Sequence, residues 1–481
     1  MKKMFSIENR LRTVAFVAGF SMMAFELVAA RLLAPTIGNS TYTWTCVIGV
    51  IMAALSLGYF LGGMLADKRG QLVDIAFLSQ ITAVLVLITC FTNILFTTFL
   101  AEAVVDQRVQ GLLASLVLFA PVSVVIGMIS PYLVKLASTS LKTLGRTAAG
   151  LSTWNAIGSI TGTFITGFVL FAVIGSSQAL ATIALVLLLA SWLIEPKNNR
   201  QVRLAISAVV LVTIISVIVF HDTETTINID TASANYRVGF QYVNGSDEKV
   251  VYLTSSPRGA QSAVYSGGIN KLLFWYTNEF AKVAENLTSK ERILVLGGGT
   301  FTVPRYLAEK YPDSTVDVVE IDPELKRIAE DYFFFEQPAN LNMFFEDARV
   351  FVNKSTQKYD LILVDVYNGV IIPWQFTTIE YTQKLAGLLQ PDGVVAVNAI
   401  ASEEGNCRPL LDALNAPYAA SLRYHQYTTD KDNETGRKNM ILIYSNQNIV
   451  IDGYQKLDIP AQRPFNDNFA PIEPLQLNCG L

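Results

Sequence analysis

The sequence predicts a multi-span α-helical membrane domain, then a small β-rich part, then an α/β domain with a mostly parallel sheet. Three observations carry this prediction. Of the 481 residues, 51% are hydrophobic and only 16% are charged, well below the roughly 25% charged of an ordinary soluble domain. Long apolar runs fill the first half of the chain, and short buried strands alternate with helices in the second. We therefore divide the chain into residues 1–221, 222–285 and 286–481.

The first part contains seven apolar runs, each close to the roughly 20 residues that cross a bilayer. We expect spans near 13–33, 43–66, 73–97, 111–134, 148–173, 177–194 and 204–220. The first run is too long and too polar internally for a cleaved signal peptide. These runs predict a multi-pass protein of the bacterial inner membrane, in contact with the lipid bilayer.

Basic residues mark alternate loops of this part and predict its orientation. They are Lys2, Lys3, Arg10, Arg12, Lys68, Arg69, Lys142, Arg146, Lys197, Arg200 and Arg203. Because short cytoplasmic loops are rich in Lys and Arg, the N-terminus is expected in the cytoplasm. Seven spans then place the C-terminal half outside, where Cys407 and Cys479 could pair. If one run is re-entrant, six crossings leave that half in the cytoplasm.

Two features inside the runs leave their role open. Glu26 and Arg31 are ionisable residues within the first span, where charge is costly and often functional. A structural ion pair, or an Arg31 that reaches the interface, explains them as well. Gly62–Gly70 resembles the loop motif of major-facilitator transporters, and one such motif is a weak indication of transport.

Charge and composition exclude some classes of function. Residues 1–221 carry a balance of +7 and residues 222–481 a balance of −11, together the net charge of −4. The acidic second half disfavours nucleic acid and suits a cationic substrate, although many soluble domains are mildly acidic. Two histidines, and four cysteines without CxxC spacing, argue against a metal site.

The second half reads as strands and helices in alternation. Residues 236–274 alternate apolar and polar side chains around turn signals, which predicts a small β-rich unit. Seven strands are then expected, at 292–296, 315–320, 341–345, 359–365, 393–398, 421–427 and 440–444. Helices are expected after the first two of these strands, through about 310 and over 323–332. This alternation predicts a doubly wound, Rossmann-like sheet.

Residues at the carboxyl ends of four strands indicate a nucleoside site, because open α/β sheets bind ligands at that edge. Gly297, Gly298 and Gly299 let backbone N–H groups approach a ligand. Glu320, about 20 residues on, is placed to accept hydrogen bonds from ribose hydroxyls. Asp347 is placed to meet an adenine amino group, and Asp365 faces the reacting centre. Thr302 replaces the third glycine of the dinucleotide fingerprint, which favours S-adenosylmethionine-type ligands over NAD; a ligand-free structural sheet is the alternative.

Residues 236–400 resemble the spermidine synthase (aminopropyltransferase) family, and the whole chain resembles its membrane-fused bacterial members. The matching segments are Gly259–Ser262 with Gln261, Tyr276, Leu296–Gly299, Val319–Pro323, Glu346–Arg349, Tyr359–Asp365 and Ile372–Thr378. The resemblance implies a small β-domain followed by a Rossmann-like domain of the class I S-adenosylmethionine-dependent transferase type.

The resemblance also implies a reaction, in which an aminopropyl group moves from decarboxylated S-adenosylmethionine to putrescine or a related amine. Asp365 matches the catalytic aspartate, which would take the amine proton. Gln261 and Tyr276 would hold the amine and the nucleoside, while the three glycines, Glu320 and Asp347 would bind the donor. No metal is implied, and soluble members suggest a homodimer.

Two departures from the family pattern bear on the substrate. Thr300 stands where the family has an aspartate that contacts the aminopropyl tail, and Asn368 stands where it has a second acidic residue. Both positions remain candidates for substrate binding, although losing two carboxylates weakens recognition of a dication. Thr300 could also tolerate the carboxylate of intact S-adenosylmethionine.

Three functions therefore remain open from the sequence. The first is a membrane-bound aminopropyltransferase. The second is an S-adenosylmethionine-dependent methyltransferase that acts on a membrane or exported substrate. The third is a transporter or sensor whose second half only binds a nucleoside or a polyamine. The retained Glu320, Asp347 and Asp365 favour the two enzymes over the third function.

Overall fold

The fold is described from a computed structural model. It describes residues 6–38, 40–104, 106–138, 140–195, 199–219, 226–231, 233–242, 248–255, 259–268, 270–367, 371–430, 437–458 and 462–480. The chain divides into two compact units, residues 1–236 and 237–481, and each is described by itself.

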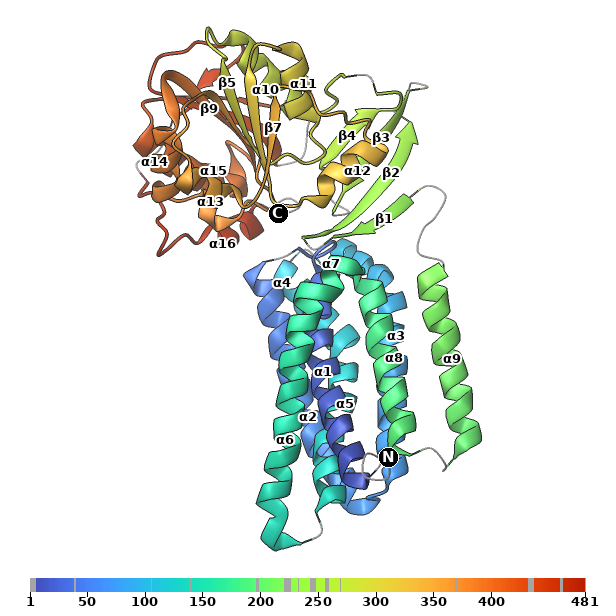
Figure 1. Ribbon diagram of the computed structural model, residues 1–481. Helices are drawn as coiled ribbons and strands as arrows, with labels where there is room; N and C mark the ends of the chain where they lie inside the picture. The colour runs from blue at the N-terminus through green and yellow to red at the C-terminus, as the bar shows by residue number, and fades with distance from the viewer. Residues whose placement is uncertain are drawn as a thin grey trace. The chain divides into compact units, whose positions relative to one another are not determined.

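The described residues of the first unit form seven continuous helical rods (Figure 1). Their helices are α1 (Ile7–Leu33), α2 (Thr41–Lys68), α3 (Leu72–Ala103), α4 (Gln107–Ala114), α5 (Ala120–Ala137), α6 (Leu144–Ile165), α7 (Phe171–Val173), α8 (Ser176–Ile194) and α9 (Arg200–Val219). One π-helical segment, Ser115–Phe119, joins α4 to α5, and another, Thr166–Leu170, joins α6 to α7. Each rod covers one of the seven runs expected from the sequence.

Six of the rods are long and apolar enough to cross a membrane. These are Ile7–Leu33, Thr41–Lys68, Leu72–Ala103, Gln107–Ala137, Ser176–Ile194 and Arg200–Val217. The rod that begins with α6 is not among them, because Gly, Ser and Thr occupy much of its sequence. Length and composition are therefore compatible with a membrane protein.

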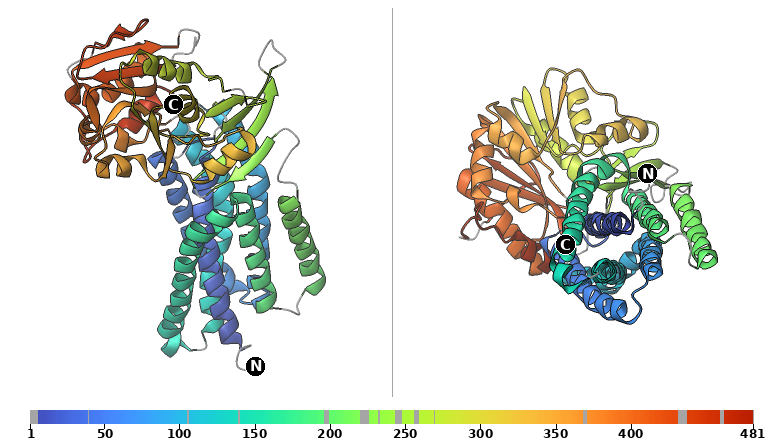
Figure 2. Two further views of the ribbon diagram at one scale, coloured as in Figure 1. Left: turned by 45° about the horizontal axis from the view of Figure 1, so that its top comes forward. Right: turned by 60° about the horizontal axis from the view of Figure 1, so that its bottom comes forward.

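Glycines bring the helices of this unit into close contact. A Cβ at Gly158 would lie 2.0 Å from the carbonyl oxygen of Phe16, and one at Gly62 would lie 2.5 Å from the Cα of Met128. The backbones of α1 and α6, and of α2 and α5, thus touch where small residues permit it. Figure 2 shows α1 inside the bundle and α9 at its edge. The glycine pairs in these helices serve packing.

Strands between the helical unit and the α/β sheet form a four-stranded sheet in the order β1-β2-β3-β4. They are β1 (Thr226–Asp230), β2 (Asn235–Tyr242), β3 (Lys249–Thr254) and β4 (Ser262–Tyr265). β2 pairs antiparallel with β3, and β3 with β4. The expected β-rich segment is thus present, and β3 and β4 lie in the same compact unit as the α/β sheet.

The second unit is built on an eight-stranded mixed sheet in the order β12-β10-β11-β9-β8-β5-β6-β7. Its strands are β5 (Arg292–Leu296), β6 (Thr315–Glu320), β7 (Leu341–Phe345), β8 (Tyr359–Val364), β9 (Leu389–Ala401), β10 (Tyr424–Thr429), β11 (Lys438–Ser445) and β12 (Gln455–Lys456). Strands β5 to β9 run parallel, whereas β10 to β12 add an antiparallel edge. The sheet is Rossmann-like and mostly parallel, as expected from the sequence.

Helices cover both faces of this sheet (Figure 1). They are α10 (Trp275–Asn286), α11 (Thr302–Lys310), α12 (Glu324–Tyr332), α13 (Ala348–Lys354), α14 (Ile379–Gly387), α15 (Arg408–Ser421) and α16 (Ile472–Asn478). All six residues of β8 are buried, so its carboxyl end is held rigidly. Side chains that follow β5, β6 and β8 therefore start from fixed positions.

Candidate functional site

The site begins at the turn after β5, where three glycines bring two backbone segments together. Gly297 has φ +92° and Gly299 has φ +53°, conformations that favour glycine. A Cβ at Gly297 would lie 2.1 Å from the carbonyl oxygen of Asp365. The backbone after β5 therefore contacts the backbone after β8, and only glycine fits between them.

Glu320 fixes the shape of this turn from the end of β6. Its Oε2 accepts hydrogen bonds from the N–H groups of Gly298 at 2.9 Å and Gly299 at 3.0 Å, and Oε1 accepts one from Asp322 at 3.0 Å. The side chain is buried, and burial raises the pKa of its carboxyl although the three N–H donors act in the opposite direction. Glu320 is thus a strand-end carboxylate in contact with the glycine turn.

Asp365 lies at the end of β8 and is held from two sides. The Nδ2 of Asn398, on the adjacent strand β9, donates to its Oδ1 at 2.9 Å, and the hydroxyl of Tyr276, on α10, hydrogen-bonds to the same carboxylate. Burial raises the pKa of Asp365 to about 6, while the Asn398 and Tyr276 hydrogen bonds limit that rise. A carboxylate with such a pKa can take up a proton near neutral pH.

Tyrosines complete the wall around this carboxylate. Burial, followed by the charge of Asp365 and the hydrogen bond to it, raises the pKa of Tyr276 well above its usual range. The hydroxyl of Tyr367 donates to the carbonyl of Asn398 at 3.0 Å and accepts from the N–H of Ile400 at 3.0 Å. Both rings therefore stay neutral, and Tyr276 acts as a hydrogen-bond donor toward Asp365.

The start of β4 brings Gln261 to the same place. The hydroxyl of Tyr276 lies 3.3 Å from the carbonyl oxygen of Gln261, so Tyr276 touches both Gln261 and Asp365. Ser262, the next residue, accepts a hydrogen bond through its Oγ from the N–H of Thr300 at 3.2 Å. Of three residues expected to bind substrate, Tyr276 thus contacts Gln261 and Asp365, and Thr300 follows the glycine turn and contacts Ser262.

Two other expected residues stand apart from this cluster. Asp347 is the N-cap of α13, where its Oδ1 accepts hydrogen bonds from the N–H groups of Arg349 at 2.8 Å and Val350 at 3.0 Å. It follows β7, the neighbour of β6, so its role toward adenine remains a prediction beside a structural role. Asn368 lies outside the described residues.

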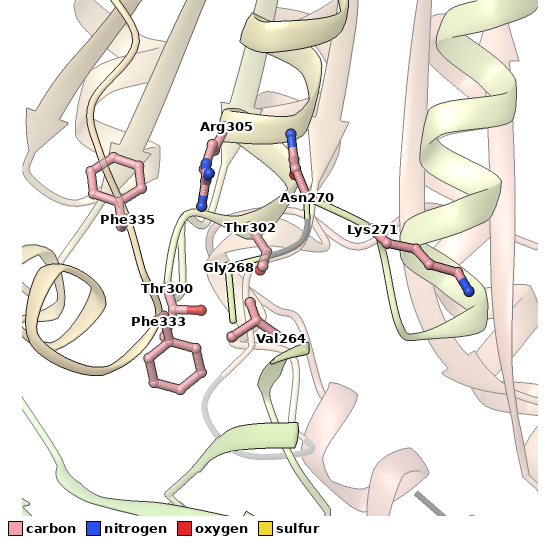
Figure 3. A pocket seen from close by; sticks show the side chains of 9 residues that line it. All are labelled: Val264, Gly268, Asn270, Lys271, Thr300, Thr302, Arg305, Phe333 and Phe335. Atoms are coloured by element: carbon pink, nitrogen blue, oxygen red, sulfur yellow. The ribbon is translucent and has the colours of Figure 1, made fainter. Parts of the chain in front are cut away.

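A small cavity adjoins Thr300 on the side of α11 (Figure 3). It is lined by Val264, Gly268, Asn270, Lys271, Thr300, Thr302, Arg305, Phe333 and Phe335. Thr300 is only 1% exposed, and its Oγ1 has no hydrogen-bond partner among the described residues. The ammonium of Lys271 lies 5.2 Å from the centre of the Tyr265 ring, and Figure 3 shows its side chain extending away from the other lining residues.

Sequence reasoning missed Asn398, Tyr367 and Ser262. Asn398 is a polar residue in the expected strand 393–398, beside the strand that carries Asp365. The argument from strand ends that selected Asp365 would have selected Asn398 too. The side chains of Ser262 and Tyr367 contact backbone groups of residues that lie more than 30 positions away in the sequence. No local sequence pattern indicates such contacts. Among the described residues, no group of three or more His, Cys, Asp and Glu is placed to hold a metal ion.

Comparison with known proteins agrees with this geometry. Residues 273–405, which carry Tyr276, the glycine turn, Glu320, Asp365 and Asn398, match the model of the spermine/spermidine synthase domain. These residues are similar to the spermidine synthase family. We refer to them below as the synthase domain, and the expected resemblance is confirmed for this part of the chain.

Individual relatives cover parts of the second half. A polyamine aminopropyltransferase of Vibrio vulnificus is 42% identical over 117 residues, which are 24% of this chain and 39% of that protein. A probable polyamine aminopropyl transferase of Bifidobacterium longum is 29% identical over 198 residues, 41% of this chain and 43% of that protein. An N-terminal histidine N-methyltransferase of Emericella nidulans is 39% identical over 110 residues, 22% of this chain and 19% of that protein.

The chain thus spans less than half the length of each of these relatives. Among solved structures, a probable spermidine synthase from Corynebacterium glutamicum is 26% identical, with a TM-score of 0.39. The similarity covers 44% of this chain and 77% of that one.

Proposed function

We propose that residues 237–481 form an aminopropyltransferase that acts on a primary amine such as putrescine, with decarboxylated S-adenosylmethionine as the donor. The position of Asp365 carries this proposal. Its backbone contacts Gly297 of the glycine turn, burial raises the pKa of its carboxyl to about 6, and Tyr276 and Asn398 orient the carboxylate. The family of the synthase domain and the names of its relatives support the same reaction.

The chemistry requires a base and a site for a sulfonium nucleoside. An alkyl ammonium, with an ordinary pKa near 10.4, must lose a proton before it can attack. Asp365 takes that proton, and the amine nitrogen then forms a bond to the carbon next to the sulfonium sulfur. The carbon–sulfur bond breaks with its electron pair going to sulfur, which leaves a neutral thioether and a secondary ammonium. Glu320 and the glycine turn hold the nucleoside during this exchange.

The residues expected to bind the donor substrate fit its nucleoside part. The Glu320 carboxylate ends β6 next to the half-buried glycine turn, the arrangement that accepts ribose hydroxyls in Rossmann-like sheets. The long apolar helices of the first unit support the further proposal that the enzyme is held in a lipid bilayer.

A second candidate is a transferase that uses intact S-adenosylmethionine. Thr300 favours it, because a neutral hydroxyl without a partner replaces the aspartate that would attract a cationic tail. Arg305 lines the same cavity, where its Nε also pairs with the Glu309 carboxylate at 2.7 Å, and it would add positive charge toward a ligand carboxylate. Methyltransferases among the relatives support this candidate as well.

One set of measurements separates the two candidates. Both donors are titrated calorimetrically into the purified full-length protein and into Thr300→Asp, with the near-isosteric Thr300→Val as the matched control. An aminopropyltransferase binds the decarboxylated donor at least tenfold more tightly, and Thr300→Asp widens that preference while Thr300→Val does not. Tighter binding of intact S-adenosylmethionine by the wild-type protein would contradict the proposal and favour the second candidate.

Product formation supplies the test of the base. Asp365→Asn keeps the size and the hydrogen-bonding shape of the side chain but cannot accept the amine proton. We expect turnover with putrescine to fall by at least a hundredfold, with donor affinity within about threefold of the wild type. Unchanged turnover would remove Asp365 from the mechanism.

A further inference from the structure

The helical unit has two ends that differ in their contacts and their charge. The rods alternate in direction along the chain, so the start of α1 lies at one end together with the α2–α3, α5–α6 and α8–α9 connections. We call this the basic end. The C-terminal end of α1, the start of α8 and residues 226–236 lie at the other, which we call the exit end, because the chain leaves the unit there.

Hydrogen bonds fasten residues 226–236 to the exit end. Arg31, in the last turn of α1, donates through Nε to the Oδ1 of Asn235 at 3.3 Å and through Nη2 to the carbonyl of Thr231. The N–H of Ser176, which begins α8, donates to the Oδ2 of Asp230 at 2.8 Å. The Arg31 guanidinium also lies 4.4 Å from the centre of the Phe171 ring. Arg31 therefore has a structural role at this end.

The start of α1 lies at the opposite end. Helix α1 has 27 residues and is about 40 Å long at 1.5 Å per residue, so its first turn is far from Arg31. At that end the side chain of Arg203, near the start of α9, donates to the carbonyls of Glu195 and of Ser191 in α8. Figure 1 shows the start of α1 and the last turn of α9 at opposite ends of the bundle.

Positive charge is concentrated at the basic end. Its loops and adjoining helix ends carry Arg10, Arg12, Lys68, Arg69, Lys135, Lys142, Arg146, Lys197, Arg200 and Arg203. At the exit end the connections 34–40, 104–106 and 174–175 contain no Lys or Arg, and the adjoining helix ends carry only Arg31 and Arg108 among the described residues. Such an asymmetry places the basic end in the cytoplasm.

A disulfide in the second unit points to the same arrangement. Cys407 and Cys479 are bonded, with their Cα atoms 4.4 Å apart, and both are buried. The bond links the start of α15 to the end of α16. Disulfides persist in oxidising compartments and are rare in the cytoplasm, where thiols are kept reduced.

We infer that the synthase domain lies on the side of the membrane opposite the cytoplasm, with Cys407 and Cys479 oxidised. This sidedness rests on the crossing of α1 alone, because its two ends define the basic end and the exit end. It does not depend on whether the rod of α6 and α7 crosses the bilayer. A prediction from the number of spans does depend on that rod, because it decides between six and seven crossings.

The sidedness has a consequence for substrate supply, and this consequence rests on the proposed function. An adenosylsulfonium donor is made in the cytoplasm by reactions that begin from ATP. A membrane-translocation step must therefore lie between the decarboxylation that makes this donor and its use by the synthase domain. The amine product is released outside the cytoplasm.

Labelling of single cysteines in the full-length protein tests the sidedness without any assay of activity. With Cys46 and Cys90 replaced by serine, Leu141→Cys reports on the basic end and Val450→Cys on the second unit. Both positions are well exposed, at 90% and 79%. In intact cells of a bacterial host, we expect a membrane-impermeant maleimide to label Val450→Cys, and to label Leu141→Cys only after permeabilisation.

The state of Cys407 and Cys479 is read in the same cells. Free thiols are blocked with N-ethylmaleimide under denaturing conditions, and the protein is then reduced and treated with a polyethylene glycol maleimide. We expect two additions in the wild type and none in the Cys407→Ser/Cys479→Ser variant. Labelling of Leu141→Cys but not Val450→Cys in intact cells, or no additions in the wild type, would overturn the inference. Neither result would bear on catalysis by the purified enzyme, so a failure of the proposed function remains distinguishable.

Discussion

Asn398 lies within β9 next to Asp365, the residue that follows β8, and the Nδ2 of Asn398 donates to the Oδ1 of Asp365 at 2.9 Å. Their backbones are held in place by the pairing of Val364 with Val397, one residue before each. The strand pairing therefore fixes the position of the amide relative to the carboxylate. This pair sets the orientation of the proposed base before any substrate arrives.

The acid limb of the pH–rate profile should depend on Tyr276. Burial raises the pKa of Asp365 to about 6, and the hydrogen bond from the Tyr276 hydroxyl limits that rise. A hydrogen bond to a charged group contributes about 1.5–3 kcal/mol, and about 1.4 kcal/mol corresponds to one pKa unit. In Tyr276→Phe we expect the lower limb of kcat/KM to move from near pH 6 toward pH 7.

Tyr454→Phe is the matched control for this measurement. Its hydroxyl donates to the Oε2 of Glu279 at 2.9 Å, in a contact that does not involve Asp365. This variant should keep the lower limb of the wild type. A profile of Tyr276→Phe that overlays the wild type would show that Asp365 does not set the limb.

Asp365 should also lower the stability of the enzyme at neutral pH. Its pKa is raised in the folded protein from an ordinary 3.8 to about 6, so the folded state binds the proton more tightly than the unfolded state. Stability from this group is then fully present below pH 4 and is lost as the pH rises through 6. At about 1.4 kcal/mol per unit, the cost at pH 8 is up to about 3 kcal/mol.

Asp365→Asn should therefore melt at a higher temperature than the wild type at pH 8, and the difference should shrink toward pH 4.5. The measurement is the thermal midpoint of the detergent-purified full-length protein at the two pH values. A lower midpoint for the variant at pH 8 would mean that the carboxylate stabilises its surroundings, contrary to this account.

Gly297 should tolerate no side chain. Its φ of +92° and the 2.1 Å approach to the Asp365 carbonyl leave no room for a methyl group. Gly297→Ala is expected to displace the Asp365 backbone, lower turnover at least tenfold and cost about 1–3 kcal/mol of stability. Gly387→Ala, at a site where an added Cβ meets nothing within 4 Å, should leave activity unchanged. Equal effects of the two substitutions would refute the steric argument.

The sequence predicted the positions of most strands along the chain well, because buried parallel strands are short apolar runs with sharp ends. Strands β5, β6 and β7 begin and end at the expected residues. The antiparallel pairing of β10, β11 and β12 was not expected, since pairing direction is set by connections and not by apolar periodicity. The rod that begins with α6 was expected from its length, yet its polarity separates it from the other six.

The site was predictable where one residue at a strand end carries the chemistry. Glu320 and Asp365 follow buried strands directly, and their positions were evident. Asn398 could have been selected as the last residue of the expected strand 393–398, but its pairing with Asp365 required the register of β8 against β9. The contact between Ser262 and Thr300 required the docking of β4 on the glycine turn. Such contacts join residues that are dozens of positions apart, so periodicity alone cannot find them.

The two hydrogen bonds from Gly298 and Gly299 to one oxygen of Glu320 mean that the proposed nucleoside site is ordered before any ligand binds. Ordering a flexible loop on binding would consume part of the interaction free energy. Here the turn is already tied to the carboxylate, and each carboxylate oxygen can accept more than one hydrogen bond. Ribose hydroxyls can thus join the existing contacts without displacing them, and a weak donor–protein interaction can still give useful affinity.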